Sequence, residues 1–118
     1  MLKNKSGKII NISSTSAIHT FSPEIIDYDA SKAGIITLTK DFAKALAPYI
    51  QVNAIAPGWV NTDINKNLEK NIIEEELSEI YLKRFAQPSE IAEIILFLAS
   101  PAASYINGTV LVADGGHD

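Results

Sequence analysis

Tyr28, Lys32 and Ser14 are the residues of this 118-residue sequence whose types and positions best suit acid and base chemistry. Tyr28 and Lys32 stand four positions apart in a stretch with helical periodicity, so their side chains share one helix face. A tyrosine side chain has an unperturbed pKa of about 10, and a lysine ammonium beside it favours the phenolate. Because such a pair also occurs by chance on many helices, its role depends on the residues that surround it.

Ser14 follows a short apolar run, Lys8 to Ser13, that has the β-branched composition of a strand. Open α/β sheets bind ligands at the carboxyl ends of their strands, so we expect Ser14 to face the same crevice as the tyrosine and the lysine. Ser16 is a rival for that position. Otherwise Ser16, like Ser13 and Thr15, is expected to be a loop hydroxyl that satisfies backbone groups.

The longest predicted helix runs from Tyr28 to about Ala47 and ends before Pro48. Apolar residues recur along it at intervals of three and four positions: Ile35, Leu38, Phe42 and Ala45. A second apolar row has similar spacing: Ala33, Ile36, Ala43 and Ala47. A helix with two apolar faces has two surfaces to bury. The segment before it, His19 to Asp27, has no period and is predicted to be a loop.

The rest of the chain continues the alternation of strands and helices. Gln51 to Ala56 is predicted to be a strand closed by Pro57 and Gly58, and Trp59 to Asn71 a mobile loop with a short helix. A charged helix with Ile73, Leu77 and Ile80 on one face follows, and then a helix capped by Ser89 with an apolar face of Ile91, Ile94, Ile95 and Leu98. Gly108 starts a turn into a last strand, Thr109 to Ala113. This order predicts an α/β fold with a parallel sheet covered on both faces.

Composition excludes several classes of function. The chain is long enough for one domain, and its net charge of -4 gives no basic surface for nucleic acid. It has no cysteine, no run of about 20 apolar residues that could span a membrane, and no secretory leader pattern. His19 and His117 have no partner at ligand spacing, so no metal site is expected. We therefore expect a cytoplasmic protein that binds neither nucleic acid nor membrane.

Four segments together carry a resemblance to a known family. They are Asn11-Ile-Ser-Ser14, Tyr28-Asp-Ala-Ser-Lys32, Val52-Asn-Ala-Ile-Ala-Pro57-Gly58 and Asp114-Gly-Gly116. In this order and spacing they resemble the short-chain dehydrogenase/reductase family over essentially the whole chain. Within that family the chain is most similar to the 3-oxoacyl-acyl-carrier-protein reductases and the related sugar-alcohol dehydrogenases. The serine-to-tyrosine gap is one residue longer here than is usual in the family, which is what leaves Ser16 as a rival to Ser14.

The resemblance implies an oxidoreductase that moves a hydride between NAD or NADP and a carbonyl compound, a secondary alcohol or an acyl thioester. It implies that Tyr28 is the acid/base, that Lys32 holds the nicotinamide ribose and tunes the tyrosine, and that Ser14 orients the substrate oxygen. Pro57, Gly58, Val60 and Thr62 match positions at the nicotinamide end of the cofactor. Ser16 and Trp59 are candidates for substrate contact, although Trp59 is equally well explained by packing.

The resemblance also implies that residues 1–118 are the C-terminal catalytic part of a single domain, namely the C-terminal half of a Rossmann-type doubly wound parallel sheet. The Gly-rich phosphate loop, the Asn-Ala-Gly motif and the catalytic asparagine of the family do not occur in this sequence. We therefore expect this chain by itself to bind a dinucleotide weakly and to leave its first strand as an unpaired edge. A homodimer or homotetramer is implied, in which the row from Ala33 to Ala47 packs against its twin.

Two other functions remain open. The chain could be an inactive truncated remnant that serves only as an oligomerisation or binding module. An unrelated hydrolase that uses Ser14 is less well supported, because no histidine is suitably placed and no nucleophile-elbow motif is present.

Two further segments are interpreted as structural. Asp114-Gly-Gly116 is interpreted as a structural turn near a subunit contact, and the run Glu74 to Glu76 as a solvated helix face.

Overall fold

The computed structural model describes residues 1–19 and 22–117 as a three-stranded parallel sheet with helices on both faces. The strands β1 (Gly7–Ile12), β2 (Ile50–Pro57) and β3 (Val110–Ala113) lie in the order β1-β2-β3. Each strand begins or ends within a residue or so of the bounds predicted from sequence. The α/β class and the parallel sheet are thus confirmed.

The middle strand β2 forms the core of the sheet. Gly7 of β1 pairs with Ile50, and Val110 of β3 pairs with Ala54, so β2 has a partner on both sides. Val52, Ala54, Ile55 and Ala56 are completely buried, which is expected where both faces of a parallel strand are covered. β1 lies at one edge of the described sheet, as predicted for the first strand.

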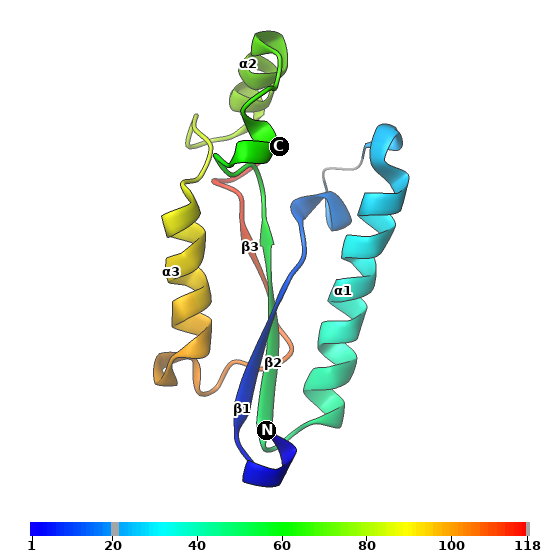
Figure 1. Ribbon diagram of the computed structural model, residues 1–118, viewed down its shortest axis with the longest axis vertical. Helices are drawn as coiled ribbons and strands as arrows, with labels where there is room; N and C mark the ends of the chain where they lie inside the picture. Colours follow the sequence, from blue (N-terminus) through cyan, green and yellow to red (C-terminus); the bar gives the residue numbers. More distant parts are fainter. Residues whose placement is uncertain (20–21, 118) are drawn as a thin grey trace.

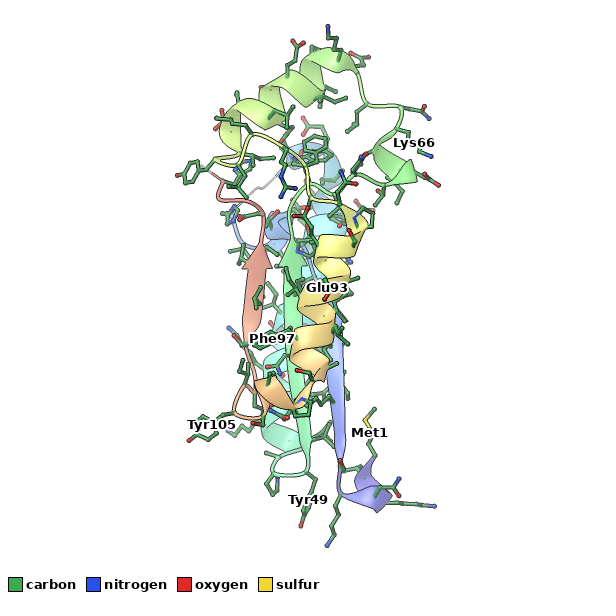
Figure 2. All side chains as sticks on the ribbon, turned by 90° about the vertical axis from the view of Figure 1, so that its left-hand side faces the viewer. Met1, Tyr49, Lys66, Glu93, Phe97 and Tyr105 are labelled. Carbon is green, nitrogen blue, oxygen red and sulfur yellow. The ribbon has the colours of Figure 1, made fainter. Side chains whose placement is uncertain are left out.

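Two helices cover the two faces of the sheet, on opposite sides in Figure 1. The helix α1 (Ile26–Ala45) packs against β1 and β2, and α3 (Pro88–Ala99) packs against the same two strands from the other side. In α3, Leu98 is fully buried, whereas Glu93 and Phe97 lie on its exposed side (Figure 2). The short helix α2 (Lys70–Glu79) stands beyond the carboxyl ends of the strands.

The helix α1 buries a different face from the one predicted. Thr39 and Ala43 are its buried residues, and Ala43 packs with Ile50 and Val52 in the core. Leu38 and Phe42 are 45% and 42% exposed. Ala43 belongs to the second apolar row, which was predicted to pack against a twin helix, and for Ala43 that prediction is wrong. The prediction counted only apolar side chains, while the face toward the sheet includes a threonine whose hydroxyl is hydrogen-bonded to that sheet.

The ends of the helices also differ from the prediction. α1 begins two residues earlier than Tyr28, directly after a short 3-10 turn at Pro23–Ile25, and ends at Ala45 rather than Ala47 because the residue before a proline disfavours helical backbone. Part of the predicted loop from His19 to Asp27 lies outside the described residues. The loop from Trp59 to Asn71 contains the expected short helix, at Asp63–Asn65.

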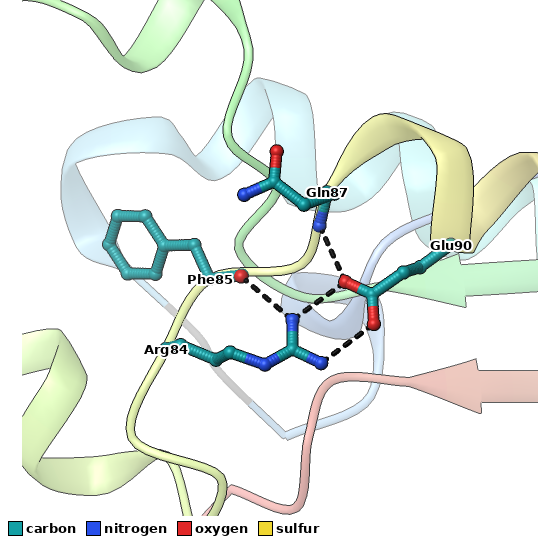
Figure 3. A network of polar contacts seen from close by, with 4 residues as sticks. All are labelled: Arg84, Phe85, Gln87 and Glu90. Atoms are coloured by element: carbon teal, nitrogen blue, oxygen red, sulfur yellow. Dashed lines mark hydrogen bonds and ion pairs between the residues drawn. The ribbon is translucent and has the colours of Figure 1, made fainter.

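The N-cap of α3 is Gln87, and the assignment of Ser89 to this position is wrong. Pro88 occupies the first helical turn, where its missing N–H costs nothing. The Gln87 N–H donates to the Glu90 carboxylate at 2.8 Å, and Arg84 donates to both oxygens of that carboxylate at 2.6 Å (Figure 3). These bonds hold the pKa of Glu90 down at about 2. Within the described residues, no helix is both long and apolar enough to cross a membrane.

Candidate active site

Hydrogen bonds between α1 and the carboxyl end of β1 set the position of the lysine. Ser13 Oγ donates to the Lys32 carbonyl at 2.8 Å, and Lys32 Nζ donates to the Ile12 carbonyl at 3.1 Å. Further along, Asn11 Nδ2 donates to Thr39 Oγ1 at 2.9 Å. The carboxyl end of β1 is therefore fixed against the first turns of α1. This agrees with the prediction that Ser13 serves the backbone.

Tyr28 and Lys32 lie side by side on α1, as their spacing predicts. Lys32 Nζ lies 5.5 Å from the centroid of the Tyr28 ring. The tyrosine is 43% exposed and lines a cleft, while the lysine is half-buried and anchored to the end of β1. The arrangement places a positive charge beside a phenol that solvent or a ligand can reach.

Ser14 has an extended backbone and caps the short helix Thr15–Ala17. Its Oγ accepts a hydrogen bond from the Ser16 N–H at 3.3 Å and one from Ser16 Oγ at 2.9 Å. A hydroxyl that accepts two bonds still has its own hydrogen to donate. Ser16 is buried and holds the oxygen of Ser14 in place, so Ser14 has the geometry of a donor to a ligand, and Ser16 that of its support.

A cleft of about 710 Å³ lies at the carboxyl ends of β1 and β2, since Ser14 and Gly58, which follow these strands closely, line it. Its lining contains six of the residues proposed from sequence: Ser14, Ser16, Tyr28, Gly58, Trp59 and Thr62. Lys32, Pro57 and Val60 are not in that lining. Pro57 ends β2 in register with Ala113, and Val60 forms a bridge with Ala86. The structure therefore brings most of the predicted site residues to one cavity. Lys32 does not line this cavity but lies beside Tyr28, which does.

Gly58 allows the ends of β2 and β3 to approach each other closely. Its N–H donates to the Ala113 carbonyl at 3.1 Å. A Cβ at this position would lie 2.8 Å from Asp114 Cβ and 3.0 Å from Asp114 Cα. Real Cβ atoms essentially never approach other heavy atoms within 3.0 Å, so a side chain here would displace the Asp114 backbone. The glycine thus lets the end of β2 pack directly against Asp114.

Sequence reasoning missed the far wall of the cleft. His19, Glu76, Glu79 and His117 also line it. His19 Nε2 lies 3.2 Å from Asp114 Oδ2, and His117 Nε2 lies 3.7 Å from Glu76 Oε2. The interpretation of Glu76 as part of a solvated helix face is wrong. No local signal could have shown these contacts, because they join segments from distant parts of the chain.

Trp59 packs against a neighbouring ring and also lines the cleft, and its contact with substrate stays a prediction. Its ring stacks on Phe85 with centroids 5.4 Å apart and an angle of 18° between the planes. Its indole N–H donates to Glu76 Oε2 at 2.5 Å. In residues 1–19 and 22–117, no three His, Cys, Asp or Glu side chains gather in a way that could hold a metal ion.

Comparison with known proteins places this chain in a family. The family model described as enoyl-(acyl carrier protein) reductase matches residues 1–118. The 3-oxoacyl-[acyl-carrier-protein] reductase of Thermotoga maritima is 46% identical over 117 residues, which is 98% of this chain and 47% of the relative. The chain therefore spans about half the length of the curated relatives it matches.

Solved structures agree with the sequence match. A short-chain dehydrogenase/reductase of the glucose/ribitol dehydrogenase type from Brucella melitensis superposes with a TM-score of 0.87 at 34% identity, over 92% of this chain and 44% of its own. A 3-oxoacyl-[acyl-carrier protein] reductase with bound NAD from the same organism gives a TM-score of 0.89 at 34% identity, over 99% and 43%. The shared fold, the cleft at the strand ends and these matches lead to one conclusion: this chain belongs to the short-chain dehydrogenase/reductase family.

Proposed function

We propose that this chain is the catalytic half of an oxidoreductase that transfers a hydride between NAD or NADP and a carbonyl or secondary alcohol substrate. One observation carries the proposal: the Tyr28 phenol and the Ser14 hydroxyl line one cleft, and the Lys32 ammonium lies 5.5 Å from the tyrosine ring. A 3-oxoacyl thioester is the substrate class that the relative from Thermotoga maritima supports.

The residues of the cleft fit the nicotinamide end of a dinucleotide. Gly58 contributes backbone without a side chain to the lining, and Thr62 adds a hydroxyl to it. Among the described residues, Lys32 Nζ donates one hydrogen bond, to the Ile12 carbonyl, so the ammonium has further hydrogens for ribose hydroxyls. Tyr28, Pro57 and Val60 complete the proposed cofactor contacts. When bound, the reduced nicotinamide supplies the hydride that adds to the carbonyl carbon.

Tyr28 acts as the acid in the reductive direction. Its hydroxyl gives a proton to the carbonyl oxygen as negative charge develops there, which leaves a tyrosine phenolate and a neutral alcohol. Ser14 donates its remaining hydrogen bond to the same oxygen and so fixes the carbonyl relative to the tyrosine. The positive charge of Lys32 stabilises the phenolate. In the oxidative direction the phenolate takes the proton back from the alcohol.

We also propose that the protein works as a homodimer or homotetramer, with the subunits in contact through the exposed face of α1 that carries Leu38 and Phe42. Leu38 and Phe42 support this, because both are large apolar residues that the described part of the fold leaves exposed. A Phe42→Glu substitution should lower the mass measured by sedimentation of the full-length protein, by which we mean this catalytic half together with the other half of the proposed domain. An unchanged mass would remove α1 from the interface.

The hydride-transfer proposal is tested by steady-state kinetics of the full-length protein with NADH and NADPH. A 3-oxoacyl thioester should be reduced, with consumption of one of the two cofactors. The Lys32→Ala variant should lose both turnover and cofactor affinity, because the lysine serves the phenol and the ribose. Unchanged cofactor affinity in that variant would show that the ribose role is wrong.

A further inference from the structure

Glu76 connects the helix α2 to Trp59 and to His117, which line the cleft with it. Its Oε2 accepts the Trp59 indole N–H at 2.5 Å and lies 3.7 Å from His117 Nε2. The Glu76 side chain is 28% exposed, so this carboxylate is largely removed from bulk water. A hydrogen bond to a charged acceptor in such a setting is stronger than one between neutral groups.

Trp59 is held from two further directions. The Phe85 ring stacks on it, and the Trp59 carbonyl accepts a hydrogen bond from the Ala86 N–H at 2.9 Å. These contacts fix the backbone and the plane of the ring, and among the described residues only Glu76 accepts a hydrogen bond from the indole N–H edge. Trp59 follows Gly58 directly, and both residues line the cleft.

We infer that Glu76 is a positioning residue for substrate binding: it holds Trp59 as a rigid wall against which the substrate lies, and thereby sets substrate affinity without taking part in proton transfer. The inference rests on the proposed function for its kinetic test. Glu76 acts through Trp59, whereas Lys32 is held by separate hydrogen bonds, from Ser13 and to the Ile12 carbonyl, and Ser14 by hydrogen bonds from Ser16. Tyr28 lies on α1 four residues before Lys32. Loss of Glu76 should therefore raise KM and leave kcat nearly unchanged.

The test uses four single substitutions and one double variant in the full-length protein. Glu76→Ala removes the acceptor, Trp59→Phe removes the donor, and the double variant removes both. Glu76→Gln keeps a carbonyl acceptor for the indole N–H and loses only the charge. Glu75→Ala is the matched control, because Glu75 is a neighbouring carboxylate on α2 that is exposed and does not line the cleft.

The expected kinetic pattern is specific. Glu76→Ala and Trp59→Phe should each raise KM for the 3-oxoacyl thioester about tenfold, and the double variant should be no worse than about twofold beyond the larger single effect. Glu76→Gln should restore most of the affinity, and Glu75→Ala should match the unsubstituted protein. An unchanged KM in Glu76→Ala, multiplicative effects in the double variant, or equal damage in Glu76→Gln and Glu76→Ala would overturn the inference.

A spectroscopic measurement separates this inference from the proposed function. Subtracting the fluorescence of Trp59→Phe from that of the unsubstituted protein isolates the emission of Trp59. This emission should shift to longer wavelength in Glu76→Ala, as the freed indole meets more water, and stay in place in Glu75→Ala. If no carbonyl substrate is turned over, the hydride-transfer proposal fails, while the shift still decides whether Glu76 holds Trp59. No shift in Glu76→Ala would overturn the positioning role.

Discussion

Replacing Thr39 with valine tests the bond that joins the active-site helix to the first strand. Thr39 is fully buried in α1, where its Oγ1 accepts from Asn11 Nδ2 at 2.9 Å and donates to the Ile35 carbonyl at 2.7 Å. Valine has nearly the same shape, so the substitution leaves no cavity. What changes is that Asn11, which is half-buried, loses its acceptor.

The structure sets the size of this effect. The Ile35 carbonyl lies within α1 and can keep its backbone hydrogen bond, so the main cost is the unpaired amide of Asn11. Leaving such a donor without a partner should lower the free energy of unfolding by about 1 to 2 kcal/mol. Thr39→Ser keeps the hydroxyl and loses one methyl group, which should cost about 1 kcal/mol through packing alone.

Urea unfolding of the full-length protein, with Asn11→Ala as the second substitution, separates the two causes. Thr39→Val and Asn11→Ala should be non-additive, with a coupling free energy of about 1 kcal/mol, because each removes the same bond. Thr39→Ser and Asn11→Ala should show a much weaker coupling. Stability of Thr39→Val equal to that of the unsubstituted protein, or strictly additive effects with Asn11→Ala, would refute the reasoning.

Two further substitutions test other contacts. Gly58→Ala should lower the free energy of unfolding by about 1 to 3 kcal/mol, since its Cβ must displace Asp114, and a lower melting temperature checks this. If the melting temperature of Gly58→Ala equals that of the unsubstituted protein, the carboxyl ends of β2 and β3 can separate freely. Arg84 and the Gln87 N–H lower the pKa of Glu90 to about 2. The ionised Glu90 therefore stabilises the folded state at pH values above the ordinary pKa of a carboxyl group, and this contribution is lost as the pH falls through about 2. The stability difference between the unsubstituted protein and Glu90→Gln should thus shrink as the pH falls from 5 toward 2, and a difference that stays constant with pH would rule out the ionised network.

The sequence predicted the elements well because their signals are local. β-branched runs bounded by glycine and proline mark β1 and β2, and helical periodicity marks α1. The contact face of α1 could not be predicted in the same way. Thr39 packs inward because Asn11 offers a partner for its hydroxyl, and that partner is known only once the strand and the helix are in contact.

The candidate site also has one part that local sequence patterns predict and one part that they do not. Tyr28 and Lys32 are four residues apart on one helix, so their proximity follows from helical geometry. The wall formed by Glu76, Trp59 and His117 depends on the loop after β2, on α2 and on the end of the chain, which no local pattern brings together. A run of glutamates is usually solvated, and the contacts with Trp59 and His117 separate Glu76 from Glu74 and Glu75.

The most direct test of the account is the Tyr28→Phe substitution in the full-length protein, with turnover and cofactor binding measured on the same preparation. The substitution removes only the hydroxyl and keeps the ring beside Lys32. We predict that reduction of the 3-oxoacyl thioester is abolished while the affinity for the nicotinamide cofactor stays nearly unchanged. Turnover at the rate of the unsubstituted protein would contradict the assignment of Tyr28 as the acid and base of this site.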